Sequence, residues 1–154
     1  MNKKKTKKKI SKKTAYFAGG CFWGLESKFK RVKGVIDTDV GFMGDVKKAT
    51  YEQVSKGNTN HAETVKVIYN SRIITYHTLL KKFFTFHDPT TLDKQGPDIG
   101  KQYRSIAFFS TKQEQDSIHK YINKSTKNIV TEVLRKKRFY KANNYHQDYN
   151  DKIL

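Results

Sequence analysis

The apolar residues of this chain switch repeatedly between an alternating and a helical spacing, and the order of these patterns most constrains its fold. Thr64–Tyr69 alternates and is rich in β-branched residues, which predicts a strand. Apolar residues at helical spacing between Ser71 and His87 predict a helix that Asp88-Pro89 ends. The same criteria predict strands over 14–18, 35–42, 104–110 and 131–140, helices over 22–32, 50–54 and 111–127, and a loop over 92–102. Helices and strands alternate without a strict βαβ repeat, so we expect an α+β fold with a mixed sheet.

The length of 154 residues fits one domain with a substantial core, and no repeat or composition break divides residues 14–154. Residues 1–13 are different, because they contain eight lysines and no acidic residue. A segment of that composition cannot bury enough apolar surface to fold. We therefore expect a disordered lysine-rich tail over 1–13 and a folded domain over 14–154.

The net charge of the chain is strongly positive, with 32 Lys and Arg against 14 Asp and Glu, or +18. Lysine runs attract phosphates without reading a base sequence, but the tail has few aromatic rings for stacking and no recognisable nucleic-acid motif. We expect the charge to serve mainly solubility, and a basic nucleic-acid-binding module stays open as an alternative. No apolar run suits a signal peptide or a membrane span, and one cysteine allows no internal disulfide, so we expect a cytoplasmic protein without membrane contact.

The only cysteine, Cys21, lies within the run AGGCFWG at residues 18–24. A lone cysteine is most often a small buried apolar residue. Here, however, glycines allow a tight turn before it, and a helical pattern begins at Phe22 directly after it. The unpaired N–H groups and the positive dipole end of a helix stabilise a thiolate. We therefore expect Cys21 to be a reactive thiolate.

Three polar segments offer a proton donor for this thiol: Tyr51, the run NHAE at 60–63, and the long loop at 95–104. Each segment taken singly also has an ordinary explanation. Exposed acids are usually solvated, and with nine tyrosines in the chain any one of them is weak support. The local sequence alone does not choose among these candidates.

A cysteine hydrolase is a second open reading, in which Cys21 pairs with His61 or His146. Spatial adjacency of this kind cannot be read from a sequence. No metal site is expected, because the five histidines form no HExxH pattern and a single cysteine excludes sites built on paired cysteines.

Six short runs follow one another across nearly all of residues 14–154. They are GCFWG at 20–24, TYEQV at 50–54, HAE at 61–63, HDP at 87–89, QGPDIGKQYRS at 95–105 and YHQDY at 145–149. In order and approximate spacing they resemble the A type of peptide methionine sulfoxide reductase. The resemblance implies a two-layer α/β sandwich of the ferredoxin-like kind, a monomer, and a reductase domain over 14–154.

The resemblance also implies a role for each polar residue that matches a family motif. Cys21 matches the nucleophile that attacks the sulfur of methionine sulfoxide, and Glu63 matches the acid that protonates or hydrogen-bonds the sulfoxide oxygen. Tyr51 and Tyr103 match tyrosines that donate hydrogen bonds to this oxygen, and Asp98 matches a further active-site acid. For its role Glu63 must be neutral near pH 7, so we expect burial to raise its pKa.

Two aromatic residues next to the cysteine, Phe22 and Trp23, match the family's pocket for the S-methyl group of the substrate. A methyl group on sulfur gains about 1 kcal/mol against aromatic faces. A fixed methyl pocket opposite fixed oxygen donors accounts for the family's preference for the S epimer, in free methionine sulfoxide or in oxidised proteins.

Regeneration is the point at which this sequence departs from many relatives, which use a second, resolving cysteine near the C-terminus. The reaction leaves Cys21 as a sulfenic acid, and this sequence holds no second thiol. We expect no bound cofactor and an external thiol reductant, either thioredoxin or glutathione with glutaredoxin.

Overall fold

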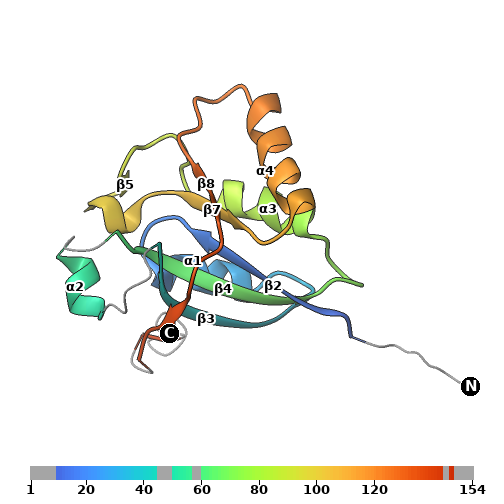
Figure 1. Cartoon of the computed structure of the whole chain (residues 1–154), viewed down its shortest axis with the longest axis horizontal. Helices are drawn as coiled ribbons and strands as arrows, with labels where there is room; N and C mark the ends of the chain where they lie inside the picture. Colours follow the sequence, from blue (N-terminus) through green and yellow to red (C-terminus); the bar gives the residue numbers. More distant parts are fainter. Residues whose placement is uncertain (1–9, 45–49, 57–59, 144–145, 148–154) are drawn as a thin grey trace, which may run out of the picture.

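The computed structural model describes residues 10–44, 50–56, 60–143, 146 and 147. Most of the expected lysine-rich tail, part of the loop after residue 43 and the last seven residues lie outside these ranges. The described chain forms one six-stranded sheet in the order β8-β7-β2-β4-β3-β9 and a separate two-stranded hairpin. Figure 1 shows α2 and β5 at one end of the sheet, away from the N-terminus.

A βαββαβ unit forms the centre of the fold, with its four strands in the order β7-β2-β4-β3. Its elements are β2 (Lys12–Ala18), α1 (Phe22–Lys30), β3 (Val35–Met43), β4 (Ala62–Asn70), α3 (Tyr76–Phe86) and β7 (Ile106–Phe109). Neighbouring strands of this unit are antiparallel. This is the ferredoxin-like arrangement, and the expected α+β class is confirmed.

Two further strands extend the central unit, one at each edge. The helix α4 (Lys112–Lys124) leads to β8 (Glu132–Arg135), which pairs parallel to β7 and makes the sheet mixed, as expected. At the other edge, β9 (Tyr140–Lys141) pairs antiparallel to β3. The sequence predicts one strand over 131–140. This prediction is wrong, because the segment divides into two short strands at opposite edges of the sheet.

The division of that segment follows from the pairing available at each edge. After β8 the Lys136 N–H still bonds to the carbonyl of Phe109 at 2.8 Å, and the chain then crosses to β3. There the backbone of Tyr140 approaches Gly41 so closely that no side chain would fit at residue 41. Phe139 packs beside Tyr16 with ring centroids 5.5 Å apart, on the sheet face that carries the smaller apolar cluster.

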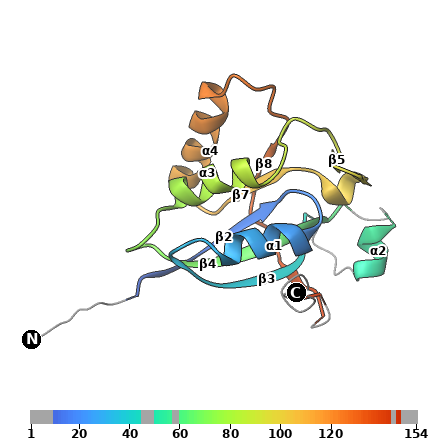
Figure 2. The same cartoon turned by 180° about the vertical axis from the view of Figure 1, so that it is seen from behind.

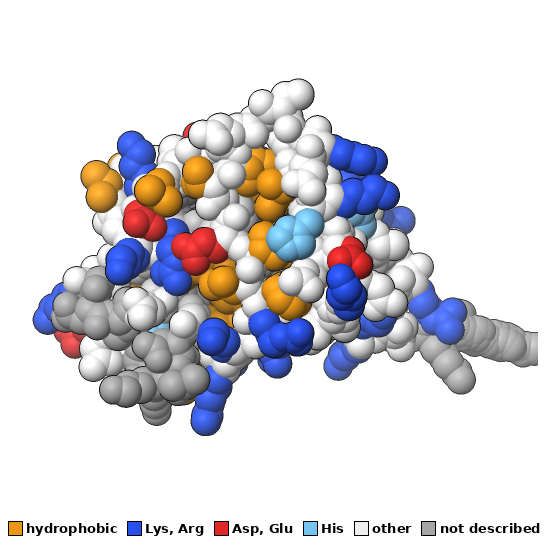
Figure 3. Space-filling view, turned by 45° about the horizontal axis from the view of Figure 1, so that its top comes forward, with side chains coloured by type: hydrophobic (Ala, Val, Ile, Leu, Met, Phe, Trp, Pro, Cys, Tyr) orange, Lys and Arg blue, Asp and Glu red, His pale blue; other side chains and the backbone are white. Residues whose placement is uncertain are grey.

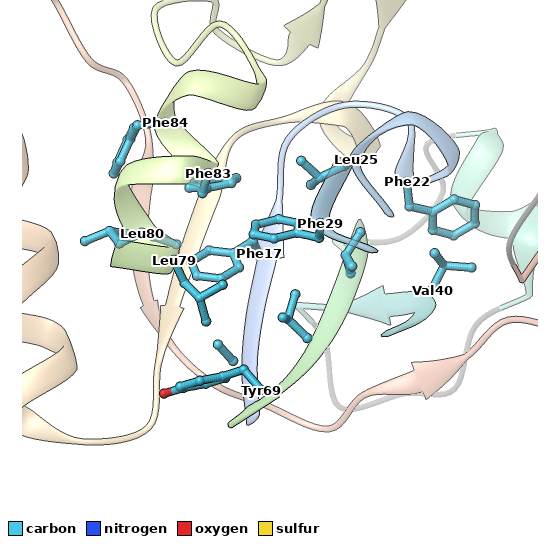
Figure 4. Close-up of a cluster of buried hydrophobic side chains, with 14 of the residues drawn as sticks. Phe17, Phe22, Leu25, Phe29, Val40, Tyr69, Leu79, Leu80, Phe83 and Phe84 are labelled. Carbon is cyan, nitrogen blue, oxygen red and sulfur yellow. The ribbon is translucent and has the colours of Figure 1, made fainter. Parts of the chain in front are cut away.

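Helices α1 and α3 lie together on one face of the sheet (Figure 2), and the main core fills the space beneath them. Phe17 of β2 stacks on Phe29 of α1 at 5.3 Å and on Phe83 of α3 at 4.8 Å between ring centroids (Figure 4). All three rings are fully buried. Removing one such ring typically costs about 3–5 kcal/mol, so this stack fixes both helices on the sheet that carries the site.

Local signals set several of the helix ends. Thr50 caps α2 (Tyr51–Ser55) with a complete capping box, in agreement with the predicted helical turn. The Thr75 hydroxyl caps α3 by accepting from the Thr78 N–H at 3.1 Å, so this helix begins five residues after the predicted start at Ser71. Before Thr75, the side chain of Asn70 holds the chain in a turn by accepting from the Arg72 N–H at 3.1 Å.

The strand β2 begins at Lys12, two residues before the predicted strand and inside the segment expected to be a disordered tail. Lys12 and Lys13 pair with Asn70 and Tyr69 of β4. The sheet therefore includes two lysines that we expect, from the charge of residues 1–13, to lie in the disordered tail. No helix in the described part of the chain is long and apolar enough to cross a membrane. Lysine and arginine side chains lie across the face seen in Figure 3, with acidic side chains between them.

Candidate active site

Cys21 lies at the N-cap of α1, directly after a turn that only glycine fits easily. Gly20 has φ +91, and a side chain there would come within 2.6 Å of Gln95. A side chain on Gly19 would come within 2.9 Å of the ring of His87. Both glycines are thus required by close neighbours, and these neighbours hold Cys21 at the end of β2.

The expectation that the Cys21 thiolate is favoured is wrong. Burial, followed by the negative charge of Glu63, raises the pKa of Cys21 to about 11. The backbone N–H groups of Trp23 and Gly24 lower this pKa, as a helix start should, but their effect is smaller than that of burial. Cys21 therefore rests as a thiol at neutral pH, because its place in the fold partly buries it beside Glu63.

Glu63, the second residue of β4, is buried with 1% of its surface exposed. Its Oε1 atom accepts a hydrogen bond of 3.1 Å from the N–H of Phe22, the residue after Cys21. Its Oε2 atom is buried and has no hydrogen-bond partner among the described residues. A buried carboxyl oxygen without a partner is uncommon and indicates a place for a ligand atom.

The ionisation of Glu63 agrees with the expectation from sequence. Burial raises the pKa of Glu63 to about 8; the Phe22 N–H opposes this effect and the charge of Asp98 adds to it. Most Glu63 side chains are therefore protonated at pH 7, so the carboxyl group can donate a proton.

Tyr51 and Tyr103 come from different elements, and the charge of Glu63 raises the pKa of both phenols. Burial and the charge of Glu63 raise the pKa of Tyr103, on the short 3-10 helix η1 (Lys101–Tyr103), to about 12. Burial also raises the pKa of Tyr51, and the side chain of Ser55 opposes this effect. Both phenols keep their protons at neutral pH and can donate hydrogen bonds.

Asp98 is held near the cysteine by a hairpin that replaces much of the predicted loop over 92–102. The hairpin consists of β5 (Lys94–Gln95) and β6 (Asp98–Ile99). The Gln95 amide binds the backbone of Asp88 through both of its polar atoms, at 2.7 and 2.8 Å. The charge of Asp98 raises the pKa of both Cys21 and Glu63.

The aromatic residues beside Cys21 form a cluster, but only one of the two has exposed surface. Phe22 is fully buried, with its ring 5.7 Å from that of Phe42. Trp23 is half-buried and stacks on Tyr51 with ring centroids 6.3 Å apart. Trp23 is therefore better placed than Phe22 to contact a ligand, and Phe22 supports the cluster from below.

His146 is a neighbour of the site to which the sequence analysis assigns no role in the reductase. Its ring stacks on Tyr51 at 4.1 Å and on Trp23 at 5.6 Å. The YHQDY run was the signal that could have indicated this position, since it is one of the matching motifs. The carboxyl group of Glu63 acts on the Cys21 pKa and is itself mostly protonated at pH 7, which suits proton donation better than the imidazole pairing of a hydrolase.

No group of three or more His, Cys, Asp or Glu side chains that could hold a metal ion is present within the described ranges. The arrangement around Cys21 is instead a thiol, a protonated carboxyl group and two phenols. These groups can attack a polarised centre and donate protons or hydrogen bonds to an oxygen atom on it.

Comparison with known proteins decides which reaction this arrangement serves. The family model of peptide methionine sulfoxide reductase matches residues 13–153. The chain belongs to this family. The reductase is similar to the peptide methionine sulfoxide reductase MsrA of Methanosarcina mazei, with 47% identity over 145 residues, 90% of this chain and 69% of that relative. It is thus a thiol-dependent reductase of methionine sulfoxide.

Solved structures show the same fold. The reduced form of Mxr1 from Saccharomyces cerevisiae matches the reductase with a TM-score of 0.84 and 35% identity, over 92% of this chain and 85% of that chain. Mxr1 in complex with Trx2 matches with a TM-score of 0.61 and 26% identity, over 90% of this chain and 84% of that chain.

Proposed function

We propose that Cys21 is the nucleophile of the reductase, that Glu63 is its proton donor, and that Tyr51 and Tyr103 donate hydrogen bonds to the sulfoxide oxygen. One observation carries this assignment: the buried carboxyl group of Glu63 has one oxygen bound to the start of α1, and its other oxygen has no hydrogen-bond partner among the residues that the structure describes. A sulfoxide oxygen that accepts from this carboxyl group brings the attached sulfur toward the cysteine. The phenols of the two tyrosines are close enough to Glu63 that its charge raises the pKa of both.

In the proposed reaction the Cys21 sulfur attacks the sulfoxide sulfur while Glu63 gives its proton to the sulfoxide oxygen. The oxygen then bonds to the Cys21 sulfur, and the substrate sulfur loses both its bond to this oxygen and its bond to Cys21. Methionine leaves, and Cys21 becomes a sulfenic acid. The thiol proton of Cys21 passes to Glu63 and replaces the proton that Glu63 gave away. One thiol and one sulfoxide thus give one sulfenic acid and one thioether.

The ionisation of the two groups supports this order of events. The carboxylate charge of Glu63 is the second largest cause of the raised pKa of Cys21. When Glu63 is protonated that charge is absent, and the thiol ionises more readily. The protonated form of Glu63 is therefore the form that favours both proton donation and attack by sulfur.

Orientation of the substrate is assigned to the aromatic side of the site. We propose that Trp23, supported by Phe22, contacts the S-methyl group opposite the oxygen donors, which selects the S epimer. Asp98 is proposed to organise water and polar contacts beside Glu63. The substrate is proposed to be methionine sulfoxide, free or within oxidised proteins.

The sulfenic acid of Cys21 must be attacked directly by an external thiol, because this sequence contains no second cysteine that could attack it. One thiol converts the sulfenic acid to a mixed disulfide with loss of water, and a second thiol releases Cys21 and leaves as a disulfide. The complex of Mxr1 with Trx2 supports thioredoxin as this reductant. Glutathione with glutaredoxin is proposed as an alternative supply of thiols, and the reductase is proposed to act as a cytoplasmic monomer.

The test is the reduction of the S epimer of methionine sulfoxide by the full chain, with dithiothreitol, thioredoxin or glutathione and glutaredoxin as reductant. We expect Cys21→Ser to abolish the reaction and Glu63→Gln to weaken it strongly. One turnover without reductant should add a single oxygen atom to Cys21, as seen by mass spectrometry.

Inactivity of the wild-type enzyme with all three reductants would overturn the proposal. Cleavage of esters or amides without any reductant, lost in Cys21→Ser, would instead support the hydrolase reading. Binding of nucleic acid that survives Cys21→Ser would report on the basic surface and leave the reductase assignment unchanged.

A further inference from the structure

Two residues that flank Tyr103 in the sequence connect it to the other proton donors of the site. Gln102 precedes Tyr103 and bonds to the helix that carries Tyr51; Arg104 follows it and bonds to the segment that leads to Glu63. We propose that Gln102 and Arg104 are positioning residues that fix the distances among these three donors. The proposal rests on the proposed roles of Tyr51, Glu63 and Tyr103.

Gln102 acts on the side of Tyr51. Its side chain is buried, with 5% of the residue exposed, and its Nε2 atom donates a hydrogen bond of 2.7 Å to the carbonyl of Ser55. Ser55 ends α2 and lies close enough to Tyr51 that its side chain lowers the pKa of Tyr51. The other end of the Gln102 amide lies against Gly100, which leaves no space for a side chain at residue 100.

These contacts confine the Gln102 amide to one position. Helix α2 lies outside the six-stranded sheet, at the end of the molecule where η1 approaches it (Figure 1). No backbone hydrogen bond between α2 and η1 occurs among the described residues. The buried amide of Gln102 therefore sets how far the Tyr51 hydroxyl lies from the Tyr103 hydroxyl.

Arg104 acts on the side of Glu63 and uses all three of its nitrogen atoms. Nη2 donates to the carbonyl of Asn60 at 2.9 Å, Nη1 to the carbonyl of Lys101 at 2.9 Å, and Nε to the Glu132 carboxylate at 3.1 Å. The side chain is 11% exposed. Asn60 lies three residues before Glu63, so the guanidinium group joins the start of the Glu63 strand to the two ends of η1.

A guanidinium group that donates in three directions is a rigid connector, since its planar fork fixes the directions of its bonds. Lysine has one nitrogen and could reproduce at most part of this geometry. The bond to Glu132, the first residue of β8, also anchors the group to the sheet. Arg104 thereby holds the Tyr103 segment at a fixed place relative to Glu63.

The reaction is sensitive to such spacing, because a reactant misplaced by about 1 Å can lose about 100-fold in rate. Three donors directed at one oxygen must have compatible distances at the same time. Consecutive residues 102, 103 and 104 meet this need with a single short segment: the middle residue donates to the substrate and its two neighbours locate the other donors.

The test uses double-mutant cycles, which separate positioning from a general loss of stability. We expect Gln102→Met to lower kcat/KM by about tenfold or more in the wild type and by less than about threefold in a Tyr51→Phe background, since the hydroxyl that it positions is then absent. Arg104→Met should likewise lower kcat/KM by about tenfold or more in the wild type and by less than about threefold in a Glu63→Gln background. Gln102→Met and Glu63→Gln lie on different sides of Tyr103, so their effects on kcat/KM, expressed as free energies, should be close to additive.

Matched controls lie on α4, away from the site. Lys112 is an exposed cation paired with Asp116 at 3.1 Å, so Lys112→Met removes a positive charge and an ion pair without touching η1. Gln113→Met repeats the glutamine substitution on an exposed position. Both should keep kcat/KM within about twofold of the wild type, and Arg104→Lys should recover part of the loss seen in Arg104→Met.

Alkylation of Cys21 by iodoacetamide provides a readout that does not depend on the oxygen donors, and its rate should change by less than about threefold in both positioning variants. Additive cycles together with an active wild-type enzyme would overturn the positioning proposal and leave the proposed function intact. An inactive wild-type enzyme would overturn the proposed function first.

Discussion

Glu63 is a carboxyl group that the fold keeps protonated, and this state affects stability as well as chemistry. Water is excluded from the side chain, and the single N–H bond from Phe22 is too weak to offset the loss of hydration. The folded state therefore binds a proton at Glu63 more tightly than the unfolded chain does. Stability from this group is fully present below pH 4.5 and is lost as the pH rises toward 8.

Glu63→Gln should remove this dependence while leaving the shape of the side chain nearly unchanged. We expect the free energy of unfolding of the variant, relative to wild type, to increase by about 1.4 kcal/mol for each pH unit between 4.5 and 8. Urea denaturation at several pH values measures this difference. A difference that stays constant over the range would show that Glu63 is ionised in the folded protein.

The same ionisation predicts the alkaline side of the activity profile. Because the protonated form of Glu63 donates the proton, kcat/KM, which reports the ionisation of the free enzyme, should fall as the pH rises through about 8. Glu63→Gln should be slow at every pH and lack this fall. The control is Tyr103→Phe, which should lower kcat/KM and keep the fall near pH 8; loss of the fall in that variant would assign it to the phenol instead.

At the scale of elements, the turn between β2 and α1 is held from two sides. The Nδ1 atom of His87, at the end of α3, donates to the carbonyl of Phe83 and its Nε2 atom accepts from the hydroxyl of Ser105, both at 2.7 Å, while its ring covers Gly19. Burial lowers the pKa of His87 to about 4, so the ring is neutral. Gln95 of the hairpin covers Gly20. The position of Cys21 thus depends on elements far from it in the sequence.

Alanine substitutions along this turn should separate close contact from helix propensity. Gly20→Ala meets Gln95 at 2.6 Å and needs a left-handed backbone, so we expect it to cost about 1–3 kcal/mol and to lower kcat. Gly24→Ala lies in α1 with no atom near the added methyl group and should stabilise the protein by about 0.5–1 kcal/mol. Thermal unfolding of both variants measures this contrast, and an equal effect on stability would contradict it.

At the scale of the whole molecule, the sheet begins earlier in the chain than its charge suggests. Lys12 and Lys13 belong to β2, and the carbonyl of Ser11 accepts from the N–H of Ser71 at 2.8 Å. The strand places these lysines at the end of the sheet opposite α2 (Figure 1). Residues 12 and 13 are thus part of the sheet, and the lysine content of 1–13 does not mark where the sheet begins.

Two truncations test this boundary. Removal of residues 1–9 takes away six lysines and should leave the melting temperature and kcat unchanged. Removal of residues 1–13 also deletes the pairing with Asn70 and Tyr69, and we expect a loss of about 2–4 kcal/mol because several backbone hydrogen bonds disappear. An equal loss in both truncations would place stabilising contacts within residues 1–9.

Much of the fold could be predicted from local patterns. The apolar stripe that ends near Phe86, the alternation in β4 and the cap at Thr111, which accepts from the Glu114 N–H at 3.2 Å, each depend on neighbouring residues. The division of 131–140 could not be predicted, because it depends on which distant edges, β7 and β3, remain available for pairing. The β5–β6 hairpin could not be predicted for a different reason, because its strands have two residues each and turn-forming residues dominate the sequence between and around them.

The sequence by itself determined most of the helices and strands, the family and the residues proposed to act, because apolar spacing and short motifs are properties of neighbouring residues. Only the tertiary structure decided their protonation. A cysteine at a helix start is expected to ionise easily, yet burial beside Glu63 raises its pKa to about 11. Desolvation depends on what surrounds a group in space, and the surroundings of Cys21 come from β4, the hairpin and η1 rather than from its neighbours in the chain.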